Sequence, residues 1–194
     1  MTQSPSSISV FARVLALGAL AALPLAVLSL TLSPGYAGAA GRAGKAKGAA
    51  ETAPLLRSRL LWSTIDVCNA TDQPDTIGVR GSMPGDHNVH DTMYMRFRLQ
   101  YMSTTTKAWV DLTKGATDAY TNVGTGASAR QAGRSFQLNP VAGQPAFTLR
   151  GVVNFEWRRK GALVAQASRA TSAGRVSLAG SDPEGFSAAT CLIG

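Results

Sequence analysis

The amino-acid sequence has few of the side chains that carry out most enzymatic chemistry. Among its 194 residues there are only two histidines and two cysteines, and charged residues make up 15%. The G-x-S-x-G elbow of serine hydrolases is missing, and so is the G-x-x-x-x-G-K-[ST] phosphate loop of nucleotide-binding proteins. There is no Cys-x-x-Cys pair and no G-x-G-x-x-G turn between a strand and a helix. We therefore expect neither catalysis nor a cofactor.

Both histidines lie in the stretch GDHNVHD at residues 85–91, where Asp86 and Asp91 flank His87 and His90. A structural zinc site needs four ligands, and an i, i+3 histidine pair reaches one point only on a helix or a tight turn. Here a Pro-Gly turn leads directly into an extended strand, in which i and i+3 point to opposite faces. We interpret the stretch as a polar loop between strands, with a metal site formed by His87, His90 and Asp91 as the alternative.

Acidic residues are missing from the first forty positions, although the whole chain has a net charge of +8. Residues 41–59 hold five lysines and arginines against one glutamate. From residue 60 to the end there are 13 basic and 10 acidic residues, so this part is only weakly basic. This distribution predicts that nucleic acid is not a partner of the folded part.

An uncharged apolar run, VLALGALAALPLAVLSLTL at Val14–Leu32, follows Arg13. Small residues come next, and Ala37-Gly38-Ala39 fits the A-x-A pattern of a cleavage site. We predict a signal peptide over residues 1–39 and a secreted or cell-envelope protein. The alternative is an uncleaved, single-pass membrane anchor, because 19 apolar residues can span a bilayer.

Residues 40–59 consist mainly of Ala, Gly, Lys and Arg. Such a composition buries too little apolar surface to offset the entropy of ordering the chain. We predict a flexible basic linker, whose partners, if it binds any, are anionic envelope polymers or lipid head groups.

From residue 60 onward, apolar and polar residues alternate, which predicts strands with one buried and one wet face. The clearest are MYMRFRLQYM at Met93–Met102 and FTLRGVVNFEW at Phe147–Trp157. In the second strand, every other residue from Phe147 to Trp157 is expected to face the core. The segment Ala162–Thr171 completes a hairpin around Gly161. Weaker strands are expected at Leu61–Cys68, Thr76–Met83, Ala108–Leu112, Ser135–Leu138 and Phe186–Leu192.

About seven short strands over residues 60–194 predict an all-β domain, an antiparallel β-sandwich, with a small barrel as the alternative. The three tryptophans, Trp62, Trp109 and Trp157, are interpreted as core residues. An exposed aromatic platform for sugars would use the same residues.

Cys68 lies in the first expected strand and Cys191 in the last. In an exported protein an even pair of this kind predicts a disulfide. Two buried free thiols are the alternative.

The stretches DVCNATDQPDTIGVRGSMPG, MYMRFRLQYM and FEWRRKGALVAQASRAT, together with Cys191, resemble secreted bacterial proteins with a single immunoglobulin-like or fibronectin-III-like domain. The resemblance covers residues 60–194 and implies an envelope-exposed β-sandwich. It assigns no functional residues, and the cysteines depart from the immunoglobulin pattern because they mark the ends of the domain.

These observations predict a non-catalytic secreted protein that acts in adhesion, envelope structure or ligand binding, with an anionic envelope polymer or another envelope protein as partner. One alternative is a metal-dependent or carbohydrate-active enzyme that uses the 85–91 loop. Another is a carbohydrate-binding module that uses Trp109.

Overall fold

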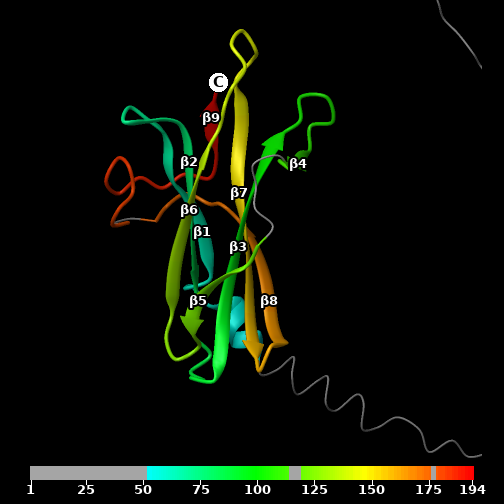
Figure 1. The fold of residues 1–194 in the computed structure, drawn as a ribbon, viewed down its shortest axis with the longest axis vertical. Coiled ribbons are helices and arrows are strands. Elements are labelled where there is room, and N and C mark those ends of the chain that lie inside the picture. The colour runs from blue at the N-terminus through cyan, green and yellow to red at the C-terminus, as the bar shows by residue number, and fades with distance from the viewer. Residues whose placement is uncertain (1–51, 114–118, 176–177) are drawn as a thin grey trace, which may run out of the picture. The chain divides into compact units, whose positions relative to one another are not determined.

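The computed structural model describes residues 52–113, 119–175 and 178–194. The predicted signal peptide over residues 1–39, and the linker as far as residue 51, lie outside the described residues. Over the described part the chain forms nine strands in two antiparallel sheets, which confirms the all-β prediction (Figure 1). No helix in this part is long and apolar enough to cross a membrane.

The smaller sheet, sheet A, has the strand order β1-β2-β6, with the bounds β1 (Trp62–Ala70), β2 (Gln73–Met83) and β6 (Arg130–Gln137). The larger sheet, sheet B, has the order β4-β3-β7-β8, with β5 also paired to β3 and β9 to β7. Its strands are β3 (Asp91–Met102), β4 (Trp109–Asp111), β5 (Thr121–Thr125), β7 (Phe147–Arg159), β8 (Ala162–Ala170) and β9 (Cys191–Ile193).

The two sheets pack face to face around one core. Ile65 and Val79 of sheet A and Met95, Val153 and Phe155 of sheet B are fully buried. Each such side chain contributes about 1.5–3 kcal/mol through removal from water. The alternation seen in the sequence is therefore the alternation of a sandwich, with one face of each strand in the core.

Gly151 allows the sheets to approach closely. A Cβ atom at this position would lie 2.6 Å from a methyl carbon of Val79 in the opposite sheet, and 2.8 Å from the methyl carbon of Thr171. Any larger residue at 151 would force the two layers apart.

The expected inward face of β7 needs a correction at its beginning. Phe147 is 47% exposed, because it lies where β7 enters the sheet and pairs only with the short strand β9. Trp157 at the other end is fully buried, and its indole nitrogen donates a hydrogen bond to the carbonyl oxygen of Pro84.

The β7–β8 hairpin turns at Lys160 and Gly161, whose φ angles are 49° and 83°. Two successive residues with positive φ are typical of a type I′ turn, which matches the twist of the flanking strands. The predicted hairpin around Gly161 is thus confirmed.

The predicted C-terminal boundary of the flexible linker, at residue 59, was placed too late in the sequence. Residues 52–57 form a short helix, and Leu55 is 8% exposed and belongs to the core. The guanidinium of Arg169 on β8 donates a hydrogen bond to the carbonyl oxygen of Leu56. The PLL stretch at 54–56 gives this segment an apolar contact that the Ala- and Gly-rich residues before it do not offer.

Cys68 and Cys191 form a disulfide, with Cα atoms 5.6 Å apart. Cys68 belongs to β1 of sheet A and Cys191 to β9 of sheet B, so the bond links the two layers. It closes a loop with a sequence separation of 123 residues.

Two of the weaker strand predictions were inaccurate, and one strand was not predicted. The strand expected at Ser135–Leu138 is β6, which begins earlier, at Arg130. Of the expected strand at Phe186–Leu192 only the end is a strand, because the backbone groups of Ser172, Asp182 and Ala188 instead form hydrogen bonds with β1. Isolated bridges join Ile65 to Ala188 and Val67 to Asp182. The missed strand is β5, whose sequence TNVGT is polar and exposed and so lacks an apolar alternation.

Candidate functional site

The outer face of sheet B carries a row of arginine and aromatic side chains, which we call the arginine–aromatic face. On β3 and β7 the outward residues lie opposite each other in register, with Tyr94 paired to Glu156, Arg96 to Asn154 and Gln100 to Arg150. Alternation places every second residue of a strand on the same face. The β3 and β7 members of the face are Tyr94, Arg96, Arg98, Gln100, Arg150, Asn154, Glu156 and Arg158.

At the hairpin end of this face lies a group that we call the tyrosine cluster, formed by Tyr94, Arg96, Tyr120, Glu156 and Arg158. The guanidinium carbon of Arg158 is 4.6 Å from the centre of the Tyr94 ring and 5.4 Å from that of Tyr120. The guanidinium of Arg96 lies 5.2 Å from the Tyr120 ring, so two cations share one tyrosine. Such contacts hold the arginine head groups in place without neutralising their charge.

Glu156 supplies the carboxylate of the tyrosine cluster. Its Oε2 atom accepts a hydrogen bond of 2.7 Å from Nε of Arg158 and forms an ion pair with that guanidinium. Burial, together with the hydrogen bond to Glu156, raises the pKa of Tyr120 above its usual range. Tyr120 is therefore neutral at physiological pH, and its hydroxyl group is bonded to Glu156.

Arg96 differs from the other arginines of the face. Its Nε atom is buried and has no hydrogen-bond acceptor among the described residues. An N–H group left without an acceptor costs about 1–3 kcal/mol.

At the other end of the face lies the tryptophan cluster, formed by Arg98, Gln100, Trp109, Asp111 and Arg150. The guanidinium of Arg150 is 4.3 Å from the Trp109 ring, and its Nε donates to Gln100. Asp111 accepts one hydrogen bond from Arg98 at 2.7 Å and one from Gln100 at 2.9 Å. Trp109 is half-buried on the surface, so its interpretation as a core residue was wrong.

A hollow of about 360 Å³ adjoins the tyrosine cluster at Asn154, which lies on β7 between Arg150 and Arg158. Its polar lining residues are Tyr120, Asn154, Gln166 and Ser168. The Asn154 side chain accepts a hydrogen bond from Arg98, while Gln166 and Ser168 belong to β8. Amide and hydroxyl groups in this arrangement can bond neutral hydroxyl groups.

The face as a whole is suited to binding anions. Its four arginines, Arg96, Arg98, Arg150 and Arg158, face only two carboxylates, those of Asp111 and Glu156. Burial lowers the pKa of Arg150, but a guanidinium remains charged at physiological pH. Guanidinium groups present fixed pairs of donors that match carboxylate and phosphate oxygens.

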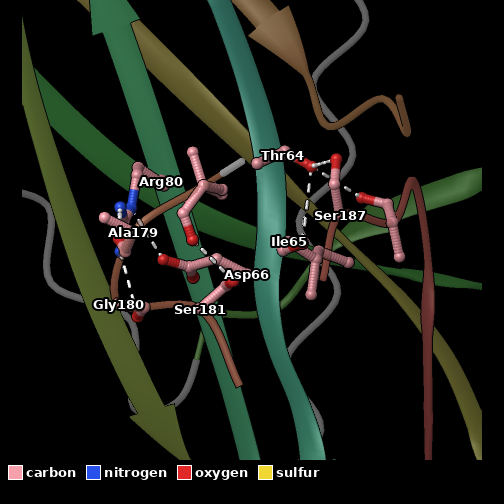
Figure 2. A network of polar contacts seen from close by, with 10 residues as sticks. Thr64, Ile65, Asp66, Arg80, Ala179, Gly180, Ser181 and Ser187 are labelled. Atoms are coloured by element: carbon pink, nitrogen blue, oxygen red, sulfur yellow. Dashed lines mark hydrogen bonds and ion pairs between the residues drawn. The ribbon is translucent and has the colours of Figure 1, made fainter. Parts of the chain in front are cut away.

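Part of the outer face of sheet A, over β1 and β2, is covered by the chain itself. Figure 2 shows Arg80 of β2 next to Asp66 of β1 and the carbonyl groups of residues 179 and 180. Nε of Arg80 donates to Asp66 at 2.8 Å, and its two terminal nitrogens donate to the carbonyl oxygens of Ala179 and Gly180. On the same face, the hydroxyl groups of Thr64 and Ser187 lie 2.7 Å apart. The donors of Arg80 are thus used within the fold.

The candidate metal ligands of the 85–91 loop lie in different settings. His87 is exposed, with a φ of 63°, and lines a cavity of about 450 Å³ together with Asp86 and residues of the 52–60 segment. His90 is also exposed. Within the described ranges, no three His, Cys, Asp or Glu side chains gather as metal ligands would.

Asp91, the third candidate ligand, has a structural partner. It is fully buried and accepts hydrogen bonds of 2.7 and 2.8 Å from Nε and Nη2 of Arg159. These bonds lower the pKa of Asp91, whereas burial and the hydrogen bond to Asp91 raise the pKa of Asp86. Asp91 therefore ties the start of β3 to the end of β7.

Sequence reasoning did not identify the arginine–aromatic face, although a signal for it was present. The polar faces of the two best-predicted strands carry Arg96, Arg98 and Arg150, and Arg158 directly follows the second strand. Pairing these strands side by side would have placed the arginines together. Trp109 was named as a possible sugar-binding residue, but its contact with Arg150 was not predicted, and Tyr120 comes from a short segment with no periodic pattern.

The chain matches no protein-family model and no curated protein. Among solved structures it is similar to the Pseudomonas fluorescens alkylpurine DNA glycosylase AlkC bound to DNA containing an abasic site analog, with 14% sequence identity and a TM-score of 0.30. The match covers 58% of this chain and 29% of that one. This likeness is too weak to bear on fold or function.

Proposed function

We propose that this chain is a non-catalytic, secreted protein of the bacterial cell envelope that binds an anionic polymer through its arginine–aromatic face. The main support for this proposal is that the face has four guanidinium groups and only two carboxylates. Three of the four guanidinium groups are stacked on aromatic rings. Rings hold the cations in fixed positions along the sheet, so that they are arranged before a ligand arrives. Arginine does not exchange protons at physiological pH, which favours binding over acid–base chemistry.

We also propose that the sandwich is immunoglobulin-like. The order β1-β2-β6 corresponds to strands A-B-E of that fold, and β4-β3-β7-β8 corresponds to C′-C-F-G. Two features depart from it. The fifth strand pairs with β3 rather than with β6, and the disulfide joins the first and last strands instead of B and F.

Secretion is supported by the disulfide, because such bonds persist in oxidising compartments. Intact-mass spectrometry of the protein from a bacterial host, with and without reduction, tests this part of the proposal. A mass that begins near Gly38 or Ala40, with both thiols blocked until reduction, is expected. A full-length mass with free thiols would contradict it.

Polymer binding is tested by titrating the full chain with polygalacturonate, a carboxylate polymer, and with dextran sulfate. Each polymer carries many charges, so affinity should fall as salt is added. The double variant Arg96→Gln/Arg158→Gln should bind at least about tenfold more weakly, since each charge-assisted hydrogen bond contributes about 1.5–3 kcal/mol. The matched control is Arg57→Gln/Arg59→Gln, which removes the same charge from the segment before β1.

An equal loss of affinity in both variants would place binding in the basic segment rather than on the sheet. Unchanged affinity in the face variant, with its thermal unfolding also unchanged, would reject the face as the binding site.

A second candidate is a carbohydrate-binding module for neutral sugars, favoured by the half-buried position of Trp109. Tryptophan fluorescence during titration with a neutral glucan distinguishes the two, because Trp109→Ala would abolish a response that Arg96→Gln leaves intact. The enzyme alternative would use the cavity beside Asp86 and His87. It requires stoichiometric zinc that a His87→Ala/His90→Ala variant loses.

A further inference from the structure

Resting on the proposed function, we propose that the polymer is an acidic polysaccharide that lies along β7 and binds the tyrosine and tryptophan clusters at the same time. The separation of the clusters, their low charge and the hollow at Asn154 each point to this ligand.

The separation follows from the strand. Arg150 and Arg158 are eight residues apart on β7, and their register with Gln100 and Thr92 on β3 is unbroken. At about 3.3 Å per residue, their Cα atoms are about 26 Å apart. Both are at even-numbered positions of one strand and so lie on the same face. A ligand that binds both clusters must therefore be an extended chain of at least about this length.

The net charge of each cluster indicates which charge density in a ligand the face can match. The tyrosine cluster has two arginines and one glutamate, and the tryptophan cluster has two arginines and one aspartate. Each thus has a single excess positive charge. Duplex DNA carries a negative charge for about every 1.7 Å of its axis, far more than two such sites would neutralise. A polymer with widely spaced carboxylates, between neutral hydroxyl-bearing units, fits better.

The hollow supplies the contacts that a sugar chain would need between the clusters. The side chains of Gln166 and Ser168 form no hydrogen bond with other described residues, and both line the hollow with Asn154 and the phenol ring of Tyr120. A polyphosphate chain can accept hydrogen bonds from the amide and hydroxyl donors of the hollow, but it has no hydroxyl groups to donate to their oxygen atoms. A sugar chain can do both, so the hollow favours a polysaccharide over an inorganic polyanion of the same charge.

Simultaneous binding at two clusters makes the second contact intramolecular, which raises affinity by 10² to 10⁴ when the chain can span both. We expect galacturonic acid oligomers to show a length threshold. Oligomers shorter than about 26 Å should bind weakly, and longer ones at least about 100-fold more tightly. Removing one cluster with Arg150→Gln/Trp109→Ala should abolish the threshold and leave the weak, length-independent affinity.

The experiment is a calorimetric titration of the full chain with galacturonic acid oligomers of increasing length, with polyphosphate and single-stranded DNA of equal charge as comparison ligands. The hollow is tested with Gln166→Ala/Ser168→Ala. Its matched control, Gln131→Ala/Ser135→Ala, removes the same residue types from exposed positions on the opposite face of the molecule.

A length threshold, a loss of about tenfold or more in the hollow variant, and no loss in its control would support the proposal. If polyphosphate or DNA binds as tightly as the oligomers and the hollow variant is unaffected, the polysaccharide inference is wrong while the face remains an anion site. If the shortest oligomer binds as tightly as the longest, binding at two clusters is wrong. If none of these polyanions binds, both the polysaccharide inference and the proposed function are wrong.

Discussion

The two outer faces of the sandwich contain the same kinds of side chain in different settings. On sheet A, the ion pair between Asp66 and Arg80 lies beneath residues 179–181, and the Asp66 side chain is 8% exposed. On sheet B, the ion pair between Asp111 and Arg98 lies on the surface, and the Asp111 side chain is 48% exposed. The distances are nearly equal, 2.8 and 2.7 Å.

An arginine–carboxylate pair on a sheet face is therefore not by itself evidence of a binding site. On sheet A the long segment before β9 uses the donors of Arg80 and covers the edge of β1. An unpaired strand edge is a site of unwanted association, and a covering segment removes it. On the arginine–aromatic face, Arg96, Arg150 and Arg158 are stacked on aromatic rings instead. Among the described residues, no backbone carbonyl group accepts a hydrogen bond from the four arginines of this face.

Among the changes that would alter the difference between the two faces, removal of the disulfide should have the largest effect. The bond fixes the C-terminal end of the segment before β9, which covers part of sheet A. In the variant Cys68→Ser/Cys191→Ser the unfolded chain regains the entropy of a loop with a separation of 123 residues. Stability should fall by about 4–5 kcal/mol. Urea unfolding measures this loss, and hydrogen exchange should show faster exchange in residues 172–188. A loss below about 1 kcal/mol would show that the covering segment is held without the disulfide.

Matched carboxylate deletions separate the two faces directly. Asp66→Ala leaves Arg80 beneath the covering segment without its partner, and should cost about 3 kcal/mol, as for a buried ion pair. Asp111→Ala removes an exposed pair and should cost at most about 1 kcal/mol. Thermal or urea unfolding of the two variants checks the ratio, and equal losses would contradict the difference in burial.

The pH dependence of stability should have opposite signs at Asp66 and Asp91. Burial raises the pKa of Asp66 above its usual 3.8, only partly offset by Arg80, so ionisation costs the folded state more than the unfolded chain. That cost is present above the folded pKa and disappears as the pH falls through it towards 3.8. The hydrogen bonds from Arg159 lower the pKa of Asp91, so its stabilisation is present above 3.8 and is lost as the pH falls through the folded pKa.

The free energy of unfolding of the native chain, relative to that of the Asp66→Asn variant, should therefore rise as the pH is lowered from 7 towards 3.8. Compared with Asp91→Asn, the native chain should lose stability below 3.8. Urea unfolding at a series of pH values gives both differences, and slopes of the same sign would refute the assignment of causes.

The smallest expected effect on stability is that of the arginine–aromatic face. Arg96→Gln removes a buried N–H group without an acceptor along with one cation–π contact, and these two contributions oppose each other. We expect a change within about 0.5 kcal/mol. A destabilisation of 2 kcal/mol or more, measured by urea unfolding, would mean that the face holds the fold together and would weaken the binding proposal.

The fold was predictable where the alternation is strict and both strands are long. Met95 and Phe155 are fully buried, as the alternation predicts. Their pairing in register is not contained in the pattern. The packing of Leu55 and the course of residues 172–188 were not predictable, because both depend on contacts with distant strands rather than on a local period. The site could be predicted only in part. Arg96, Arg98 and Arg150 lie on the polar faces of the predicted strands. The stacking of Arg96 on Tyr120 and of Arg150 on Trp109 depends on how other segments fold back onto sheet B.

The most direct test of the difference between the two faces is a nuclear magnetic resonance titration of the full chain with polygalacturonate, observing the Nε–H signals of the arginine side chains. We predict that the signals of Arg96, Arg98, Arg150 and Arg158 shift together, while that of Arg80 does not. Shifts confined to Arg80, or to Arg57 and Arg59 before β1, would contradict the assignment of polymer binding to the arginine–aromatic face.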